Sequence, residues 1–197
     1  MAAFADRLVR RVAARLRAVE RADARAPLRL GPGATIGDDF AVYGAEHVDI
    51  GAGVRIGRRA RLQTIESFGG VSYQPRIVIG ARTTIEDDCH IGAAGLVEIG
   101  EDVLIAGGVY VTDHRHRYDD VEVPVRDQPL TVGTVAIGAG SHIGENACVL
   151  GPLTIGEHAV VGANAVVIHD VPARTVVAGV PARPVRRFDG TRWVAER

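Results

Sequence analysis

The sequence lacks lysine altogether, and all of its 23 basic side chains are arginine. With 24 acidic residues the formal net charge is -1, so no global field favours nucleic acid or an anionic surface. The two cysteines, Cys89 and Cys148, follow no metal or disulfide spacing. No apolar run approaches the length of a bilayer span, and arginines interrupt the N-terminus where a secretory signal needs an apolar core. These absences lead us to expect a cytoplasmic protein that binds no nucleic acid.

Aromatic residues make up only 5% of the chain, so aliphatic side chains must build most of the core. Such residues return at every sixth position: eighteen positions are Ile, Leu or Val, and eleven of them precede Gly. The positions are Leu30, Ile36, Val42, Ile50, Ile56, Leu62, Ile79, Ile85, Ile91, Ile99, Ile105, Val111, Ile137, Ile143, Val149, Ile155, Val161 and Val167. A six-residue period fits neither a helix nor a simple two-residue strand alternation. It predicts a solenoid in which each hexapeptide forms one short face and then turns.

The repeat is interrupted four times, always after the third hexapeptide of a block. Three hexapeptides make one triangular coil of about 18 residues, so we expect every insertion to leave the same corner of the prism. The two sizeable insertions are residues 66–76 and 113–134. Loops grouped on one edge of a rigid scaffold are a natural place for function.

The chain divides into three predicted parts. Residues 1–28 are expected to contain an amphipathic helix, because apolar residues recur at helical spacing between arginines. Residues 29–178 are the solenoid, and 179–197 form a tail with a hairpin turn at the Asp-Gly pair 189–190. The helix is expected to cap the first coil, since a solenoid must cover its open end. Contact with a membrane surface through residues 3–25 is the less favoured alternative.

Three features resemble the hexapeptide-repeat acyltransferases: the register, the Asp-His-Arg-His opening of the long loop, and the ending VVGANAVVIHDVPARTVVAGVPARPVRR. Within that family the chain is similar to the maltose, galactoside and polysaccharide O-acetyltransferases. The resemblance covers nearly all of residues 30–187. It implies an all-β solenoid of the left-handed parallel β-helix type. It also implies a homotrimer with coenzyme A between neighbouring subunits, and no metal.

The activity implied by the resemblance is transfer of an acetyl group from acetyl-CoA to a hydroxyl of a saccharide or glycan precursor. A sugar hydroxyl is a weak nucleophile and needs a base, and histidine suits this role at neutral pH. Counted without gaps from Ile99, the family's catalytic histidine falls on His116, and a slip of two residues places it on His114. Asp113 is expected to orient the imidazole.

The resemblance also assigns residues to coenzyme A. Arg183 and Arg186 match a basic pair that is expected to meet its phosphates. Ala163 matches a small residue whose backbone contacts the arm of the molecule. Ile168 and His169 replace a frequent Thr-Lys pair, so this part of the site is expected to differ.

The acceptor site is less well defined by the sequence. His142 stands where the family often carries tryptophan, and with Tyr118 it is a candidate contact to a small-molecule or glycan acceptor. His47, His90, His158 and His169 are expected on the surface or in turns.

Three other functions remain open. One is N-acylation of an amino sugar on the same scaffold. Another is a zinc protein like the γ-type carbonic anhydrases, although the spacing of His114 and His116 does not match two of those ligands. The last is a trimeric scaffold without catalysis, against which the intact loop and the basic tail both argue.

Overall fold

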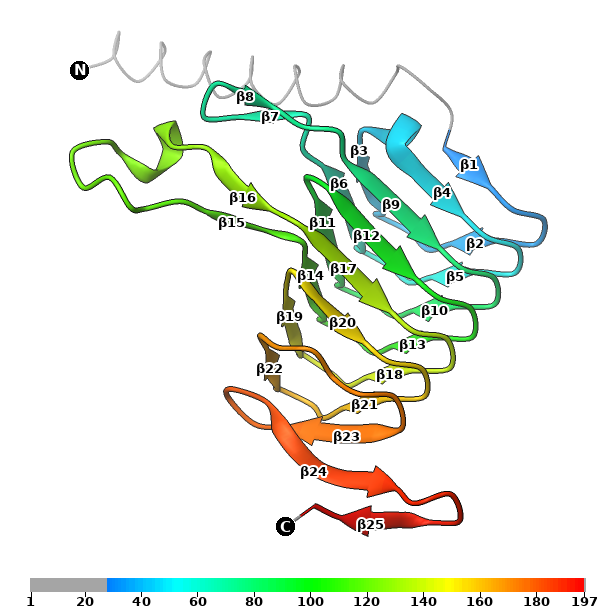
Figure 1. Cartoon of the computed structure of the whole chain (residues 1–197). Helices are drawn as coiled ribbons and strands as arrows, with labels where there is room; N and C mark the ends of the chain where they lie inside the picture. Colours follow the sequence, from blue (N-terminus) through cyan, green and yellow to red (C-terminus); the bar gives the residue numbers. More distant parts are fainter. Residues whose placement is uncertain (1–27, 197) are drawn as a thin grey trace, which may run out of the picture.

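The computed structural model describes residues 28–196, which wind as stacked triangular coils (Figure 1). Each coil gives one short strand to each of three parallel sheets, which we name face 1, face 2 and face 3. The solenoid is a left-handed parallel β-helix, as the resemblance implies. The predicted N-terminal helix lies outside the described residues. Within the described part of the chain, no helix is long and apolar enough to cross a membrane.

The strands of the three faces follow one another in chain order. Face 1 contains β1 (Arg29–Leu30), β4 (Val48–Ile50), β9 (Arg76–Ile79), β12 (Leu96–Ile99), β17 (Thr134–Ile137) and β20 (Leu153–Ile155). Face 2 contains β2 (Thr35–Ile36), β5 (Arg55–Ile56), β10 (Thr84–Ile85), β13 (Leu104–Ile105), β18 (His142–Ile143), β21 (Val160–Val161) and β23 (Thr175–Ala178). Face 3 contains β3 (Ala41–Tyr43), β6 (Arg61–Thr64), β11 (His90–Ala93), β14 (Tyr110–Thr112), β19 (Cys148–Leu150) and β22 (Val166–Val167).

The core consists of the aliphatic ladder that the repeat predicts. On face 1, Ile50 pairs with Ile79 and Ile99 pairs with Ile137, in each case one coil apart. From the second coil onward every repeat position is buried, and each buried side chain of this size contributes about 1.5–3 kcal/mol. Leu30 in the first coil is 48% exposed, because no described coil stacks on its outer side. The turns of neighbouring coils also pack closely against one another. A Cβ on Gly31 would lie only 2.5 Å from the backbone nitrogen of Ala52 in the next coil.

All the insertions leave the corner between face 3 and face 1, as predicted. The first sizeable one folds as the hairpin of β7 (Ser67–Phe68) and β8 (Val71–Ser72). The second is an arm built from the antiparallel strands β15 (His114–His116) and β16 (Leu130–Val132), which projects from the coils in Figure 1. Two short 3-10 turns, η1 (Ala45–His47) and η2 (Val125–Asp127), complete the loops.

The tail continues face 2 with two antiparallel strands, β24 (Arg183–Phe188) and β25 (Trp193–Ala195). The predicted hairpin forms, but residues 189–192 connect its strands instead of the two residues expected. The N–H of Asp189 donates to the carbonyl of Arg192 at 3.0 Å across this connection. Gly190 has a φ of 105°, a region that favours glycine.

Candidate active site

The root of the arm is anchored by a buried carboxylate. Asp113 is fully buried at the corner between face 3 and face 1. Its Oδ1 accepts the backbone N–H of Ala94 at 2.9 Å, and its Oδ2 accepts that of Gly95 at 2.7 Å. A buried carboxylate is stable only when hydrogen bonds or opposite charge compensate for its lost hydration. These contacts hold the start of the arm against the turn that joins β11 to β12.

His114, the next residue, completes the environment of this carboxylate. Its Nδ1 lies 2.9 Å from Oδ1 of Asp113, and its side chain is only 10% exposed. An Nδ1 proton donated to the carboxylate fixes the tautomer and leaves a lone pair on Nε2, which has only a long contact of 3.5 Å with the Thr112 hydroxyl. The hydroxyl of Thr112 lies 2.9 Å from the same Nδ1 and further restricts the ring. The pair therefore has the arrangement of a general base held by a carboxylate.

The two insertions meet above His114 and form a roof. The ring of Phe68, from the β7–β8 hairpin, lies edge-on to His116 with centroids 4.8 Å apart. The phenol oxygen of Tyr73 accepts the backbone N–H of Leu130 at 2.8 Å, which joins the first insertion to β16. A side chain on Gly69 would collide with the carbonyl of Gln128, so the hairpin lies directly on the arm.

Under this roof is a hollow of about 360 Å³ on the outer surface of face 3. It is lined by Gln63, Ile65, Ser67, Phe68, His90, Gly92, Tyr110, His114 and His116. Three of these side chains are imidazoles and two are aromatic rings. None is a carboxylate or a guanidinium. The lining is therefore polar, but it offers no carboxylate or guanidinium to pair with a charged ligand.

His90 was expected on the surface or in a turn, and it lies on the outer side of face 3, in a strand and partly covered. It lies half-buried on β11, with its ring edge-on to Tyr110 at a centroid distance of 5.2 Å. Burial lowers the pKa of His90, and the charges of Arg61 and His114 lower it further. A signal was present in the sequence: His90 precedes the inward Ile91 as Tyr110 precedes Val111. Stacking the third hexapeptides of successive coils therefore places the two rings side by side.

Within one chain, the two residues predicted to contact the acceptor lie outside the hollow beside His114. Tyr118 is 74% exposed on the arm, beyond the hollow. His142 is on the outer side of face 2, paired with Leu104 and Val160. Its Nδ1 is buried and has no hydrogen-bond partner among residues 28–196. Neither side chain lines the space in front of His114.

The residues assigned to coenzyme A are also on other parts of the prism. Arg186 pairs with Val176 and Arg183 with Ala178, so both arginines point from the outer side of face 2. Neither forms an ion pair within residues 28–196. Ala163 lies in the turn between β21 and β22, where its backbone nitrogen stacks on Gly144 of the preceding coil.

Ile168 and His169 follow β22, at the corner between face 3 and face 1. Both are exposed. The structure therefore does not bring all five assigned residues together within one chain.

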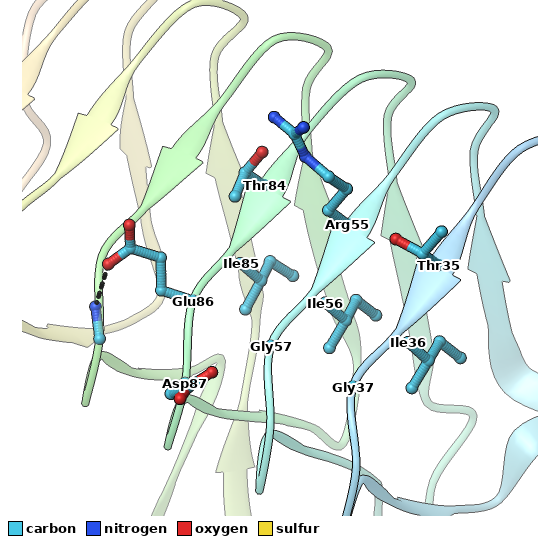
Figure 2. Close-up of a pocket in the computed structure, with 11 residues that line it drawn as sticks. Thr35, Ile36, Gly37, Arg55, Ile56, Gly57, Thr84, Ile85, Glu86 and Asp87 are labelled. Atoms are coloured by element: carbon cyan, nitrogen blue, oxygen red, sulfur yellow. Dashed lines mark hydrogen bonds between the residues drawn. The ribbon is translucent and has the colours of Figure 1, made fainter.

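A larger hollow, of about 690 Å³, lies on face 2 near the first coils (Figure 2). Thr35, Arg55 and Thr84 stand side by side along it, one from each of three successive strands. Its carboxylates already have partners: Glu86 accepts the N–H of Gly107, and Asp87 accepts the backbone N–H and the guanidinium of Arg58. Since no histidine or free nucleophile lines this hollow, the smaller one is the better candidate for chemistry.

One cluster in the described part of the chain has metal-ligand geometry, and it contains neither loop histidine. It consists of Glu46, His47 and Glu66, whose ligand atoms lie within 4.8 Å of one another. His47 Nε2 lies 2.7 Å from a Glu66 oxygen. This contact ties the start of the first insertion to the preceding coil.

Comparison with known proteins gives consistent matches along the solenoid. A family model described as the hexapeptide repeat of succinyl-transferase matches residues 82–113 and 134–168, which are the coils on either side of the arm. The chain is 33% identical to a protein of Escherichia coli K12 provisionally named lipopolysaccharide biosynthesis O-acetyl transferase WbbJ, over 78% of this chain and 76% of the relative. It is 35% identical to the serine acetyltransferase of Mycobacterium tuberculosis H37Rv, over 68% of this chain and 53% of the relative.

A solved structure shares the fold at lower identity. It is a point mutant of AntD, an N-acyltransferase from Bacillus cereus, in complex with dTDP-4-amino-4,6-dideoxyglucose and coenzyme A. The TM-score is 0.67 at 20% identity, over 80% of this chain and 82% of that one.

Proposed function

Because the chain belongs to the hexapeptide-repeat acyltransferases, we propose that it moves an acetyl group from acetyl-CoA to a hydroxyl of a saccharide or glycan precursor. The observation that carries this proposal is the pair of Asp113 and His114 facing a neutral, polar hollow. An acyltransferase acting on a hydroxyl needs a base in front of an acceptor site, and this is where the chain offers one.

We assign the base to His114. Its Nδ1 is held by a buried carboxylate, its ring is almost covered and the residue lines the hollow, so we expect Nε2 to act on the acceptor. His116 is exposed at the mouth of the same hollow and its ring contacts Phe68, with no carboxylate partner among residues 28–196. The ungapped count favours His116, and the geometry supports the two-residue slip.

The reaction follows from this arrangement. Nε2 of His114 takes the proton of the acceptor hydroxyl as its oxygen attacks the thioester carbonyl. The tetrahedral intermediate then breaks its carbon–sulfur bond, and the imidazolium returns the proton to the departing thiolate. The N–H groups of Ala94 and Gly95 already bind Asp113, so they are not available to stabilise the oxyanion.

The lining of the hollow favours a neutral acceptor. Its amide, hydroxyl and imidazole groups can donate to and accept from sugar hydroxyls, while the rings of Phe68 and Tyr110 offer apolar surface to a pyranose. A protonated amine would find no carboxylate among the lining residues. We therefore place O-acetylation ahead of N-acylation of an amino sugar.

Face 2 has the composition expected of a coenzyme A groove. Its outer side carries a column of Leu104, His142, Val160 and Val176, which ends at Arg186 and is flanked by Arg183. Three aliphatic side chains with one imidazole among them suit the arm of coenzyme A, which is apolar between its amide groups. Two guanidinium groups with no carboxylate partner among residues 28–196 suit its phosphates.

Replacing both Arg183 and Arg186 with alanine should weaken coenzyme A binding by a factor of about 10 to 150 for each charge-assisted hydrogen bond removed. Both residues are exposed on β24, so the coils should remain folded. Isothermal titration with coenzyme A gives the affinity, and Arg192→Ala, on the same hairpin, is the matched control. Unchanged affinity of the double variant would refute this assignment.

The base and the coenzyme A column lie on different sides of one prism. His114 is at the corner between face 3 and face 1, and in a triangular prism that corner is opposite face 2. A neighbouring subunit must therefore bring its face 2 to this corner. A closed ring of three such contacts makes three identical sites, so we propose a homotrimer.

Light scattering should then give three times the chain mass of 20.8 kDa. A sharper test is complementation at a low acetyl-CoA concentration: His114→Ala and the double Arg183→Ala, Arg186→Ala variant, each strongly impaired alone, should regain activity when co-expressed. In a mixed trimer some sites take both intact halves from different chains. A monomer by light scattering, or no recovery in mixed trimers, would refute the shared site.

The activity itself is tested by release of free thiol from acetyl-CoA in the presence of a panel of acceptors. Methyl glycopyranosides offer only hydroxyls, whereas the corresponding amino sugars also offer an amine. We expect thiol release with the methyl glycopyranosides, and mass spectrometry should identify an O-acetyl product. Exclusive formation of an amide product would favour the N-acyltransferase alternative.

A further inference from the structure

Gly92 is unusual among the glycines of the chain. Most either have a φ in the left-handed region or lie so close to a neighbouring coil that a Cβ would collide with it. At Gly92, on strand β11, a Cβ would meet nothing nearer than 3.5 Å. Neither turn geometry nor close packing therefore explains this glycine. Because a glycine within a strand weakens it relative to alanine, its presence calls for another reason.

The space above Gly92 lies between two imidazoles. A Cβ there would be 3.5 Å from Cε1 of His114 and 4.0 Å from Nε2 of His90. In the ladder of face 3, the residues on either side of it are Gln63 and Thr112, which both carry side chains. The missing side chain therefore opens the floor of the hollow next to the proposed base.

His90 forms the other wall of this space. Its ring is oriented by the edge-on contact with Tyr110, and no side-chain hydrogen bond of His90 exists within residues 28–196. Burial and the neighbouring Arg61 and His114 lower its pKa, which favours the neutral ring. A neutral imidazole offers one donor and one acceptor, the combination that a sugar hydroxyl can use.

We propose that Gly92 and His90 determine acceptor specificity: the pyranose ring lies over Gly92, between the imidazoles, and a hydroxyl adjacent to the acetylated one binds His90. This inference rests on the proposed function. It predicts that the site selects a cyclic polyol over a small alcohol, because a ring placed over Gly92 reaches both imidazoles and a small alcohol does not.

The principal test is Gly92→Ala. With the methyl pyranoside that releases thiol fastest, KM for the acceptor should rise about tenfold or more, the usual effect of one carbon in a fitted pocket. KM for acetyl-CoA should not change. The melting temperature should be unchanged or higher, since the new methyl group meets only ordinary contacts. For glycerol, used as a small alcohol probe, KM should rise less than it does for the pyranoside.

Gly107→Ala is the matched control. Gly107 also has an ordinary φ, and its Cβ would come no nearer than 3.4 Å to any atom. It lines the larger hollow on face 2 and not the one beside His114. This variant should leave the acceptor KM unchanged. The comparison distinguishes the loss of acceptor space above Gly92 from a general effect of adding a methyl group.

His90 is tested by two substitutions. His90→Leu removes both hydrogen-bonding atoms and should raise the acceptor KM up to about tenfold with little change in kcat. His90→Gln keeps a donor and an acceptor and should restore most of the affinity. A fall in kcat with unchanged KM in His90→Leu would contradict a binding role.

The outcomes separate the inference from the function on which it rests. If no pyranoside is acetylated, both are wrong. If pyranosides are acetylated with dependence on His114, but Gly92→Ala leaves their KM unchanged, only the inference is wrong. If Gly92→Ala lowers the melting temperature and raises KM equally for the pyranoside and for glycerol, Gly92 is a packing residue. That result would also overturn the inference.

Discussion

Replacing His114 with alanine is expected to lower kcat for acetyl transfer by about 10²- to 10⁴-fold, the usual contribution of a general base. The acceptor hydroxyl is then left without a group to take its proton as it attacks. Affinity for coenzyme A should stay the same, because the arginines proposed to bind its phosphates are on face 2. Steady-state thiol release and titration with coenzyme A measure the two effects separately.

His116→Ala is the matched control, since both imidazoles come from β15 and line the same hollow. Its ring is exposed and packs on Phe68, so its removal should change the acceptor KM more than kcat. The reverse result, with His116→Ala inactive and His114→Ala active, would transfer the base to His116. Full activity in both variants would exclude the histidine mechanism.

Asp113→Asn is expected to lower kcat by a similar factor, about 10²- to 10⁴-fold, because the carboxylate sets the tautomer of the base. The Asp113 oxygens receive N–H donors from Ala94, Gly95 and His114. An asparagine amide must turn its own NH₂ toward one of these donors. Either the imidazole loses its orientation or a buried backbone N–H loses its partner, which destabilises the fold by about 1–3 kcal/mol.

Nitrogen-15 NMR of the imidazole distinguishes Asp113 as a positioning residue from a purely structural one. In the native protein the proton should reside on Nδ1 of His114, and in Asp113→Asn this preference should be lost. Asp119→Asn is the control, because Asp119 is exposed and, among residues 28–196, forms an ion pair with Arg117 of the arm alone. An Asp113→Asn protein that keeps both the tautomer and kcat would show that the carboxylate only anchors the arm.

The six-residue period by itself determined the solenoid, its core and the corner from which the loops leave. This was possible because each repeat position has one physical requirement: an aliphatic side chain that faces inward and stacks on the same position one coil away. The requirement is local and recurs, so it can be read from residues such as Ile50, Ile79 and Ile99 without knowledge of the whole. The position of Asp113 at the root of the long loop follows from the same register.

The composition of the site depends on contacts that no repeat encodes. Only the folded chain brings Phe68 of the first insertion onto His116 of the second, and only there does Asp113 meet the backbone of Ala94 and Gly95. Spacing in a strand indicates which side of a sheet a residue faces, but not which loop folds over it. For this reason the sequence left His114 and His116 open as candidate bases, and our proposal of His114 rests on a contact with one buried carboxylate that only the tertiary structure contains.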